Sequence, residues 1–428
     1  MTLSLTQASD RPRPPRLLAV SPPCVTAVNR AVYRHLAERF GVNVHLVVPA
    51  YCNAGKSRIP CQPTAEEPIP VTQLEPSGSH PRVLRLDGLE DVIARLKPTH
   101  VLIDGDPATR LVLEVIRCVH GTGTKIWVLT CENFERRYLR EAAGRLARGR
   151  LPQAFGSVLT WAMLRRVRHR IHHVFTISRD GTRALTSLGF EGRVTQVPIG
   201  FDPELFRPQD DEIVAATRRQ LGLTARTVAY IGRLVPEKGV DVLLKTLATL
   251  KDLEWQLLID KFDTYSSPFV RMLDQLVNSL GIQDRVVYFD ATHENMPNYM
   301  NAADIIALPS VSGRTIKEQY GRVVPEAMAC GKVVVGSTSG TIPELIGDAG
   351  FVFPAGDRPA LARLLCQLLT ASEGDLIAIR SRAIRRAHDQ FSICQQAEIW
   401  AAMLQEGKSE PVEIQPQNHP AMSVACET

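Results

Sequence analysis

The sequence predicts an α/β protein made of two doubly wound domains, each built on a parallel sheet, with a cleft between them. Its 428 residues are enough for two or three domains of ordinary size. Short apolar runs of strand length alternate with segments of helical apolar spacing, which is typical of β-α-β units. The alternation stops at residues 197–208, which contain Pro198, Pro203 and Pro208, and then restarts. Two blocks of similar size follow from this break.

The strands are expected where nearly continuous apolar runs occur, because strands covered on both faces have no polar side. In chain order these runs are residues 17–20, 42–48, 100–103, 125–130, 173–177 and 194–197, then 227–231, 255–259, 286–289, 304–308 and 333–337. Intervening segments such as 27–40 and 110–119 carry apolar residues at every third or fourth position, as amphipathic helices do.

The predicted domain limits follow from these blocks. The first domain is expected at 16–198, the second at 199–385, and a final helix at 386–405. The polar segments 1–15 and 406–428 are expected to be unstructured.

Composition excludes several classes of protein. Apolar residues make up 44% and charged residues 22%, which is ordinary for a globular protein. A net charge of +5 is too small for bulk nucleic-acid binding. The nine cysteines include no CxxC pair, which argues against a disulfide framework or a zinc site and favours a reducing cytoplasm. No apolar run approaches the roughly 18 residues of a membrane-spanning helix.

Positive charge is concentrated in one segment, Arg136 to Arg170, which holds ten arginines and a single acidic residue, Glu141. Apolar residues and Trp161 lie between the arginines. Such a segment can lie on the anionic inner face of a membrane. An ordinary solvated pair of helices is the alternative interpretation, and the sequence leaves both open.

A first candidate site follows the strand at 227–231. Gly232, Arg233 and Lys238 lie in a short loop between the end of this strand and the start of a helix. Two cations beside free backbone N–H groups suit a diphosphate. A loop with two solvated basic side chains is the alternative.

A second candidate site contains Glu318 and Glu326. Carboxylates can accept two hydrogen bonds from the vicinal hydroxyls of a ribose or another sugar. Residues 327–331 read as a helix that ends in a glycine cap. The alternative is that these glutamates simply lie at a helix start, where the helix dipole favours them.

Four segments together resemble the retaining glycosyltransferases of family 4, also called group 1, which have the GT-B fold. The Glu318–Glu326 pair resembles the E-x7-E signature of that family and stands in EQYGRVVPEAMACG. The other three segments are YIGRLVPEKG at 230–239, VPIGFDPELFRP at 197–208 and FSICQQAEIW at 391–400. The resemblance covers about residues 170–405, and it implies that the final helix crosses back to the first domain.

The resemblance implies a nucleotide-sugar donor carrying uridine, guanosine or adenosine. Arg233 and Lys238 would neutralise its diphosphate, Glu326 would bind the ribose hydroxyls, and Glu318 would contact the transferred sugar. The implied donor-binding set is Gly232, Arg233, Lys238, Glu318, Gln319, Tyr320, Gly321 and Glu326, with Arg233, Lys238 and Glu318 catalytic.

The implied reaction is a retaining, metal-independent hexosyl transfer (EC 2.4 type) without a cofactor. The acceptor would be a saccharide or a lipid-linked molecule, in glycan, polysaccharide or glycolipid biosynthesis. Two alternatives are a sugar-nucleotide epimerase of the same fold and a non-catalytic nucleotide-sugar-binding protein. The sugar, the base and the acceptor stay open.

The first domain departs from the family pattern at two places. Many members have a Gly-Gly loop after the first strand, where this chain has Ser21-Pro22-Pro23-Cys24. Many also have a histidine near the position where this chain reads Thr130-Cys131-Glu132-Asn133. No catalytic histidine is therefore assigned. Glu132 and Asn133 are candidates for contacts to the acceptor or to the transferred sugar.

Overall fold

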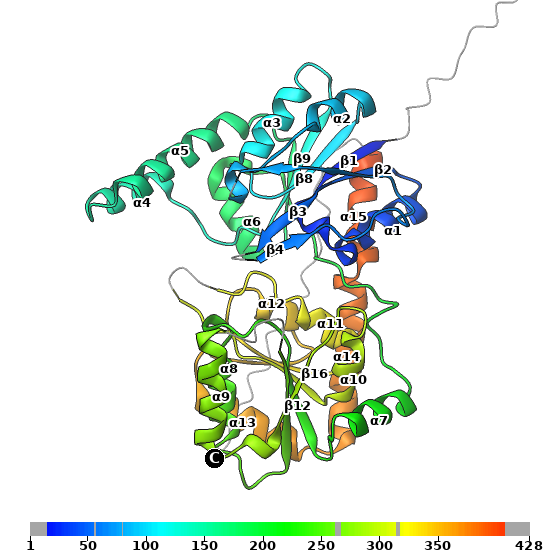
Figure 1. The fold of residues 1–428 in the computed structure, drawn as a ribbon, viewed down its shortest axis with the longest axis vertical. Coiled ribbons are helices and arrows are strands. Elements are labelled where there is room, and N and C mark those ends of the chain that lie inside the picture. Colours follow the sequence, from blue (N-terminus) through cyan, green and yellow to red (C-terminus); the bar gives the residue numbers. More distant parts are fainter. Residues whose placement is uncertain (1–14, 55–56, 79, 262–266, 314–316, 407–428) are drawn as a thin grey trace, which may run out of the picture. The chain divides into compact units, whose positions relative to one another are not determined.

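A computed structural model of the chain describes residues 15–54, 57–78, 80–261, 267–313 and 317–406 (Figure 1). They divide into two compact units. The first contains the described residues up to Thr130, Arg137–Val174 and the described chain from Ala397 on, and the second contains Cys131–Arg136 and Phe175–Gln396. The termini expected to be unstructured, 1–15 and 406–428, fall outside the described residues except for Pro15 and Glu406.

The first sheet has seven strands in the order β11-β10-β9-β8-β1-β2-β5. Their bounds are β1 Arg16–Val20, β2 Asn43–Pro49, β5 Val71–Leu74, β8 His100–Asp104, β9 Lys125–Thr130, β10 His173–Thr176 and β11 Val194–Gln196. The pairs that β1 forms with β2 and β8 are parallel, as are β2–β5 and β8–β9. Two short antiparallel pairs lie outside the sheet: β3 Tyr51–Ala54 with β4 Ser57–Pro60, and β6 Pro76–Ser77 with β7 Arg85–Leu86.

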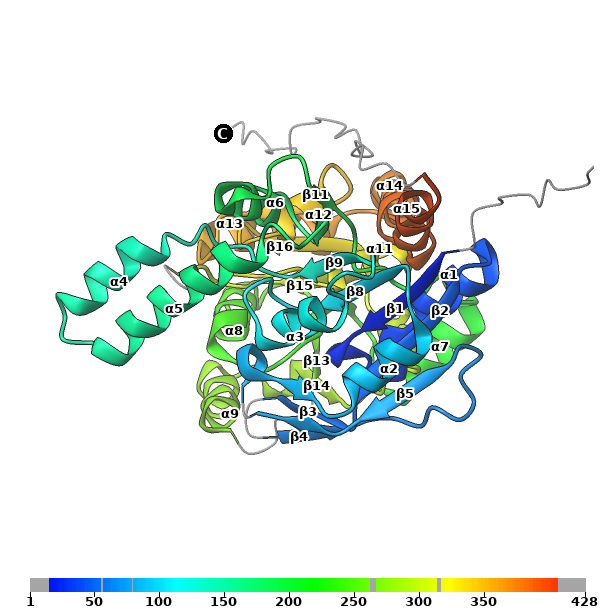
Figure 2. The same ribbon diagram turned by 90° about the horizontal axis from the view of Figure 1, so that it is seen from above.

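The helices of the first unit include α1 Ala31–Phe40, α2 Leu89–Leu96 and α3 Arg110–Cys118. A further two, α4 Tyr138–Leu146 and α5 Leu151–Val167, form a hairpin that projects away from the first sheet (Figures 1 and 2). Part of the last helix also belongs to this unit. There Trp400, only 1% exposed, packs on Tyr33 of α1 with the ring centroids 5.5 Å apart.

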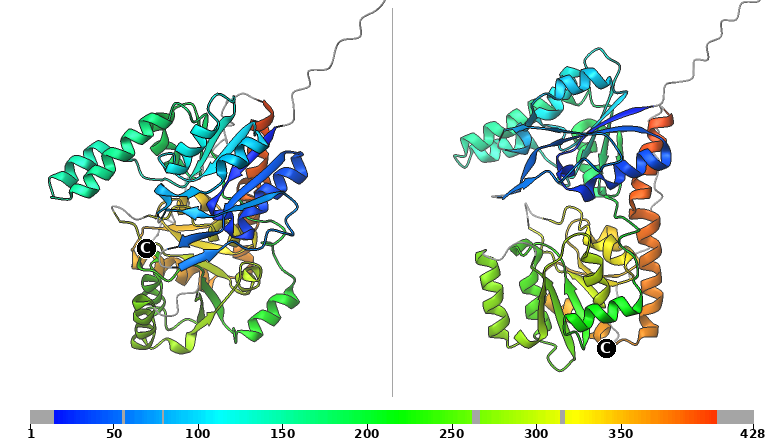
Figure 3. Two further views of the ribbon diagram at one scale, coloured as in Figure 1. Left: turned by 45° about the horizontal axis from the view of Figure 1, so that its top comes forward. Right: turned by 45° about the vertical axis from the view of Figure 1, so that its right-hand side comes forward.

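The final helical segment is divided at Ser392. Helix α14 spans Glu373–Phe391 and α15 spans Ile393–Glu406, so the expected helix at 386–405 comprises the end of one helix and most of the next (Figure 3). Phe201 pairs with the backbone at this division. Its N–H donates to the Phe391 carbonyl over 3.0 Å, and its own carbonyl accepts from the Ile393 N–H over 2.9 Å.

The second sheet has six strands in the order β14-β13-β12-β15-β16-β17, and all of its neighbouring strands are parallel. The bounds are β12 Arg226–Tyr230, β13 Trp255–Asp260, β14 Val286–Phe289, β15 Ile305–Leu308, β16 Val333–Ser337 and β17 Phe351–Phe353. The remaining helices are α6 Arg179–Leu185, α7 Asp211–Gln220, α8 Val240–Leu247, α9 Pro268–Leu280, α10 Met296–Ala302, α11 Val323–Ala329, α12 Ile342–Ile346 and α13 Arg358–Thr370.

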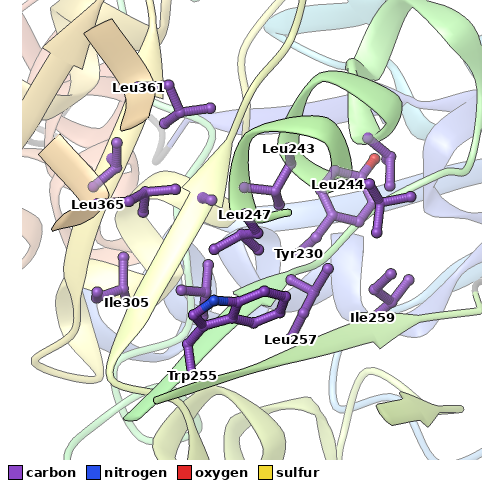
Figure 4. Close-up of a cluster of buried hydrophobic side chains, with 14 of the residues drawn as sticks. Tyr230, Leu243, Leu244, Leu247, Trp255, Leu257, Ile259, Ile305, Leu361 and Leu365 are labelled. Carbon is purple, nitrogen blue, oxygen red and sulfur yellow. The ribbon is translucent and has the colours of Figure 1, made fainter. Parts of the chain in front are cut away.

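Trp255 is the largest side chain in the core of the second unit (Figure 4). It packs between the apolar faces of the sheet and of α8, and its indole N–H donates to the Leu250 carbonyl over 2.9 Å. Leu243, Leu244 and Leu247 of α8 are fully buried beside it. Burial of this kind contributes about 1.5–3 kcal/mol for each large apolar side chain, so α8 is held firmly against the sheet.

The prediction of an α/β fold with doubly wound parallel sheets is confirmed. Each of the eleven expected strands is present, with ends within one residue of those predicted. The sequence analysis missed β5, β17 and the two antiparallel pairs, which are short. Within the described residues, no helix is both long enough and apolar enough to cross a membrane.

Candidate active site

The second sheet reverses its strand order between β12 and β15. Strands β13 and β14 follow β12 on one side, while β16 and β17 follow β15 on the other. In open α/β sheets, ligands bind beyond the carboxyl ends of the strands at this kind of reversal. Two loops begin there, one after Tyr230 of β12 and one after Leu308 of β15.

The loop after β12 is held in place by three contacts. The Tyr230 hydroxyl donates to the Arg233 carbonyl over 2.7 Å. The Val311 N–H, from the loop after β15, donates to the Glu237 carbonyl over 2.9 Å. Gly239 has a φ of +68°, and a Cβ atom there would lie only 2.1 Å from the Pro309 carbonyl oxygen. Glycine is required at 239 because no side chain fits this approach.

Lys238 and Glu318 meet at this place. The Lys238 Nζ lies 2.6 Å from Glu318 Oε2, and the Ser310 hydroxyl donates to the same oxygen over 2.9 Å. The two charged side chains are 22% and 9% exposed, so both are largely removed from water. An ion pair with a third polar partner fixes the positions of its atoms more closely than an exposed pair does.

The backbone of Glu318 is also fixed. Its N–H donates to the Ser339 hydroxyl over 3.2 Å. Its carbonyl accepts from Asn133 Nδ2 over 3.2 Å. Gly340, with a φ of +56°, approaches so closely that a Cβ atom there would lie 1.9 Å from the Glu318 carbonyl oxygen. The carboxylate of Glu318 is therefore presented from a rigid segment.

Three backbone donors follow Glu318. The N–H groups of Gln319, Tyr320 and Gly321 donate to no acceptor among the residues that the structure describes. The Tyr320 carbonyl, in contrast, accepts from the Thr341 hydroxyl over 2.8 Å. The predicted donor-binding residues 318–321 thus combine a fixed carboxylate with N–H groups that can bind a ligand's oxygen atoms.

Glu326 lies in α11 and is 6% exposed. Its Oε1 lies 3.1 Å from Nε of Arg322, one helical turn earlier. Burial raises the pKa of the Glu326 carboxyl to about 7, and the neighbouring Arg322 partly opposes this shift. Near neutral pH, this carboxyl is therefore present in both protonated and ionised forms.

The remaining candidates lie in different surroundings. Arg233 is exposed, and within the described residues its side chain has no hydrogen bond or ion pair. Glu132 accepts from the N–H groups of Asn133 and Phe134 over 3.1 and 3.0 Å, and pairs with Arg136 at 3.5 Å. Glu132 therefore stabilises its own turn, whereas Asn133 reaches Glu318.

The sequence analysis did not anticipate Ser310 and Ser339, which orient Glu318. A polar residue two positions after the end of a buried strand, as Ser310 is, was the available signal. It also missed a contact in the first unit, where the first sheet reverses its order between β1 and β8. There the Ser21 hydroxyl donates to Asp104 Oδ2 over 2.9 Å.

Residues 225–371 match the family described as glycosyl transferases group 1. This segment belongs to the group 1 glycosyl transferases. It includes Lys238, Glu318 and Glu326 together with Ser310, Ser339 and the close approaches at Gly239 and Gly340. The resemblance predicted from the sequence is thus confirmed.

Two relatives illustrate the sequence similarity of this group 1 glycosyl transferase segment. A Corynebacterium glutamicum protein is 33% identical over 229 residues, which are 50% of this chain and 59% of the relative. Its name is GDP-mannose-dependent monoacylated alpha-(1-6)-phosphatidylinositol monomannoside mannosyltransferase. The D-inositol 3-phosphate glycosyltransferase of Mycolicibacterium vanbaalenii is 35% identical over 199 residues, 43% of this chain and 42% of the relative. The match spans about half the length of these relatives.

Solved structures extend the likeness over most of the chain. A glycosyltransferase from Rickettsia africae superposes with a TM-score of 0.71 at 17% identity, covering 92% of this chain and 98% of that one. Anabaena HepE in complex with UDP and glucose superposes with a TM-score of 0.65 at 19% identity, covering 91% and 99%. At this level of identity the likeness concerns the fold alone, which is the GT-B fold predicted from the sequence.

Proposed function

We propose that this protein is a retaining, metal-independent glycosyltransferase that moves a sugar from a nucleotide-sugar donor to a saccharide or lipid-linked acceptor. The observation that carries the proposal is the fixed contact between Lys238 and Glu318 at the strand-order reversal of the second sheet. It sets a cation and a carboxylate side by side where such sheets bind nucleotides.

The cations have a role in the departure of the leaving group. Negative charge grows on the diphosphate as the bond to the sugar breaks. Lys238, held by Glu318 and by its position before α8, offers a positive charge at a fixed place. Arg233 adds a second, exposed cation. Fixed cations stabilise the developing charge more than the ground state and so lower the barrier.

The carboxylate side of the site has a role in orienting the sugar. The Glu318 carboxylate accepts hydrogen bonds from hydroxyls of the transferred sugar, while the N–H groups of residues 319–321 donate to sugar or phosphate oxygens. Glu326 binds the ribose. Its bond to Arg322 uses Oε1, and a carboxylate has about four acceptor positions in all.

The relatives' names support the choice of substrate class. One relative is named as GDP-mannose-dependent and acts on a phosphatidylinositol mannoside, and the Anabaena structure holds UDP with glucose. We therefore propose a donor of the UDP-, GDP- or ADP-sugar class and a role in glycolipid or polysaccharide biosynthesis. The proposed place of action is the cytoplasmic side of the membrane.

Nucleotide release tests the reaction. The protein is first screened against UDP, GDP and ADP by thermal shift, because a ligand that binds only the native state raises its stability. The matching nucleotide sugars are then supplied with and without saccharide and lipid-linked acceptors. Free nucleoside diphosphate should accumulate only when an acceptor is present. Isomerised donor without release would identify an epimerase, and a thermal shift without turnover on any acceptor would favour a non-catalytic binding protein.

A further inference from the structure

The α4–α5 hairpin carries an unusual exposed surface. We call residues 137–170 the arm; all of it belongs to the first unit, from whose sheet it projects in every view (Figures 1, 2 and 3). Of the eleven large apolar side chains that are exposed in the described residues, six lie in the arm. They are concentrated on about one twelfth of the chain, and clusters of this kind mark interaction surfaces.

Over residues 151–160, the side-chain pattern of α5 is reversed relative to an ordinary surface helix. The buried positions there are Ala154, Ser157 and Thr160, which are small or polar, whereas the later buried positions are Leu164 and Val167. Its outward face carries Leu151, Phe155, Val158 and Leu159. These four have the spacing i, i+4, i+7, i+8, which places them on one stripe of the helix. Phe155 is 70% exposed. The large apolar residues of this stripe therefore face away from the protein's own core.

Helix α4 continues the pattern. Leu139 and Leu146, seven residues apart on one face, are 48% and 53% exposed. The two helices are joined by polar contacts instead of by these residues: Arg145 of α4 donates to the Gln153 carbonyl over 3.1 Å and also contacts the Ser157 hydroxyl. The exposed leucines are thus not needed to hold the hairpin together.

The arm is also strongly cationic. It contains nine arginines and one acidic residue, Glu141, which pairs with Arg145 at 3.3 Å. Arg165 and Arg166 are exposed nearly two turns beyond Leu159, where the apolar stripe ends, and Arg165 Cζ lies 5.1 Å from the ring centroid of Trp161. Positive charge therefore borders the apolar stripe and has almost no acidic partner within the arm.

We propose that the arm docks on the surface of an anionic lipid bilayer. The apolar stripe enters the boundary between headgroups and acyl chains, and the arginines bind lipid phosphates. A second copy of the chain fits less well, because two arms would bring like charges together. This inference is independent of the transfer reaction, since it concerns a surface outside the candidate active site.

Vesicle co-sedimentation tests the proposal. The full chain is mixed with phosphatidylcholine vesicles or with vesicles that also contain phosphatidylglycerol, at low and high salt. Binding is expected to the anionic vesicles and to weaken with salt, because salt screens the arginines. Absence of binding to either vesicle, or equal binding to both, would overturn the proposal.

Two pairs of variants separate the arm from the rest of the surface. Phe155→Ser with Leu159→Ser should weaken partitioning by about tenfold or more, since the buried apolar area is lost. The matched control is Ile213→Ser with Ile377→Ser, two residues that are 45% and 60% exposed elsewhere. Arg165→Glu with Arg166→Glu should also weaken partitioning to anionic vesicles by about tenfold or more, because these arginines bind lipid phosphates. Its control is Arg219→Glu with Arg385→Glu, which makes the same change in charge at exposed positions.

Folding and self-association are measured on the same samples. Circular dichroism and the melting temperature should be unchanged in all four variants, because every substituted side chain is exposed. Arm variants that bind vesicles as well as their controls do would overturn the proposal. Light scattering provides a second check. If the wild-type protein is a dimer and the Phe155→Ser, Leu159→Ser variant is not, a second copy of the chain covers the apolar stripe, and the proposal is overturned.

Discussion

Lys238 and Glu318 are 80 residues apart in the sequence, and their side chains meet with Nζ and Oε2 separated by 2.6 Å. Each charge is balanced by the other in the free protein. A nucleotide-sugar donor offers both of them new partners, a phosphate for the lysine and hydroxyls for the carboxylate. Removing either residue should therefore affect a different part of the proposed reaction.

Lys238→Ala should lower turnover by about 100- to 1000-fold, which is the effect of removing one fixed group that stabilises charge in a transition state. Lys245→Ala is the matched control, because Lys245 also pairs with a carboxylate, Asp241 at 2.8 Å, but lies further along α8. Turnover is measured as nucleotide release with saturating donor and acceptor. Equal rates in the two variants would remove Lys238 from the mechanism.

Glu318→Gln should separate binding of the sugar from binding of the nucleotide. The amide oxygen of glutamine still accepts hydrogen bonds, but the charge and the second acceptor oxygen are lost. Affinity for the nucleotide sugar should therefore fall by about tenfold, from loss of a charged hydrogen bond. Affinity for the nucleoside diphosphate alone should stay the same or rise, because Lys238 loses its carboxylate partner. Calorimetric titration with both ligands measures this difference. Glu204→Gln, at an exposed glutamate, is the control. If Glu318→Gln weakens binding of the nucleotide sugar and of the nucleoside diphosphate equally, Glu318 does not contact the transferred sugar.

Gly239→Ala should destabilise the second unit, because the new Cβ meets the Pro309 carbonyl at 2.1 Å. Gly222 provides the control. Its φ of +66° is nearly the same as the +68° of Gly239, but a Cβ atom added at Gly222 would have no neighbour within 4 Å. Gly222→Ala should lower the free energy of unfolding by about 1–2 kcal/mol, the cost of left-handed backbone.

Because of the steric contact, Gly239→Ala should lower the free energy of unfolding by about 1–3 kcal/mol more than Gly222→Ala does, which is typical of overpacking. Chemical denaturation of both variants measures the difference. If the two substitutions cost the same, the close approach between the two loops does not exist in solution.

Glu326→Gln should change how stability depends on pH. The folded-state pKa of Glu326, about 7, lies above its ordinary value of 4.5. The folded protein thus holds this proton more tightly than the unfolded chain does. The protonated Glu326 makes its full contribution to the free energy of unfolding below pH 4.5, and this contribution is lost as pH rises through 7.

Glutamine does not titrate, so the stability of the variant relative to wild type should increase between pH 5 and pH 8. From the raised pKa of Glu326, this pH-dependent difference in the free energy of unfolding is at most on the order of 3 kcal/mol. Denaturation curves of both proteins across this pH range provide the measurement. A difference in stability that stays constant with pH would show that Glu326 is not the titrating group.

The sequence was sufficient for eleven strands of the two sheets, because a strand buried on both faces leaves an apolar run such as WQLLI. It was not sufficient for β5 and β17, which are short. It also predicted roles for Lys238, Glu318 and Glu326, since each stands in a recognisable motif, and the structure brings Lys238 and Glu318 into contact. It could not show that Arg322 occupies one oxygen of Glu326, or that Ser310 and Ser339 orient Glu318. Those partners are set by packing between distant segments, and a single serine carries no pattern of its own.

The reversed face of α5 was equally hidden in the sequence. Leu151, Phe155 and Leu159 have the spacing of a core-facing stripe, and periodicity alone places such a stripe inward. Only the structure shows that Ala154, Ser157 and Thr160 take the inner positions. The arginines indicated an anionic partner, whereas the outward position of the apolar residues could not be derived from them.

The contact between Tyr33 and Trp400 has a consequence for biosynthesis. A ribosome makes the chain from its N-terminal end, and the first unit lacks one of its largest buried side chains until the final helix has emerged. The second unit has all of its strands by Phe353, and the helices that complete its core, α13 and α14, end by Phe391. Maturation of the first unit therefore waits until the segment from Ala397 on has been made, and nascent chains halted before residue 397 should expose Tyr33 to proteases and chaperones.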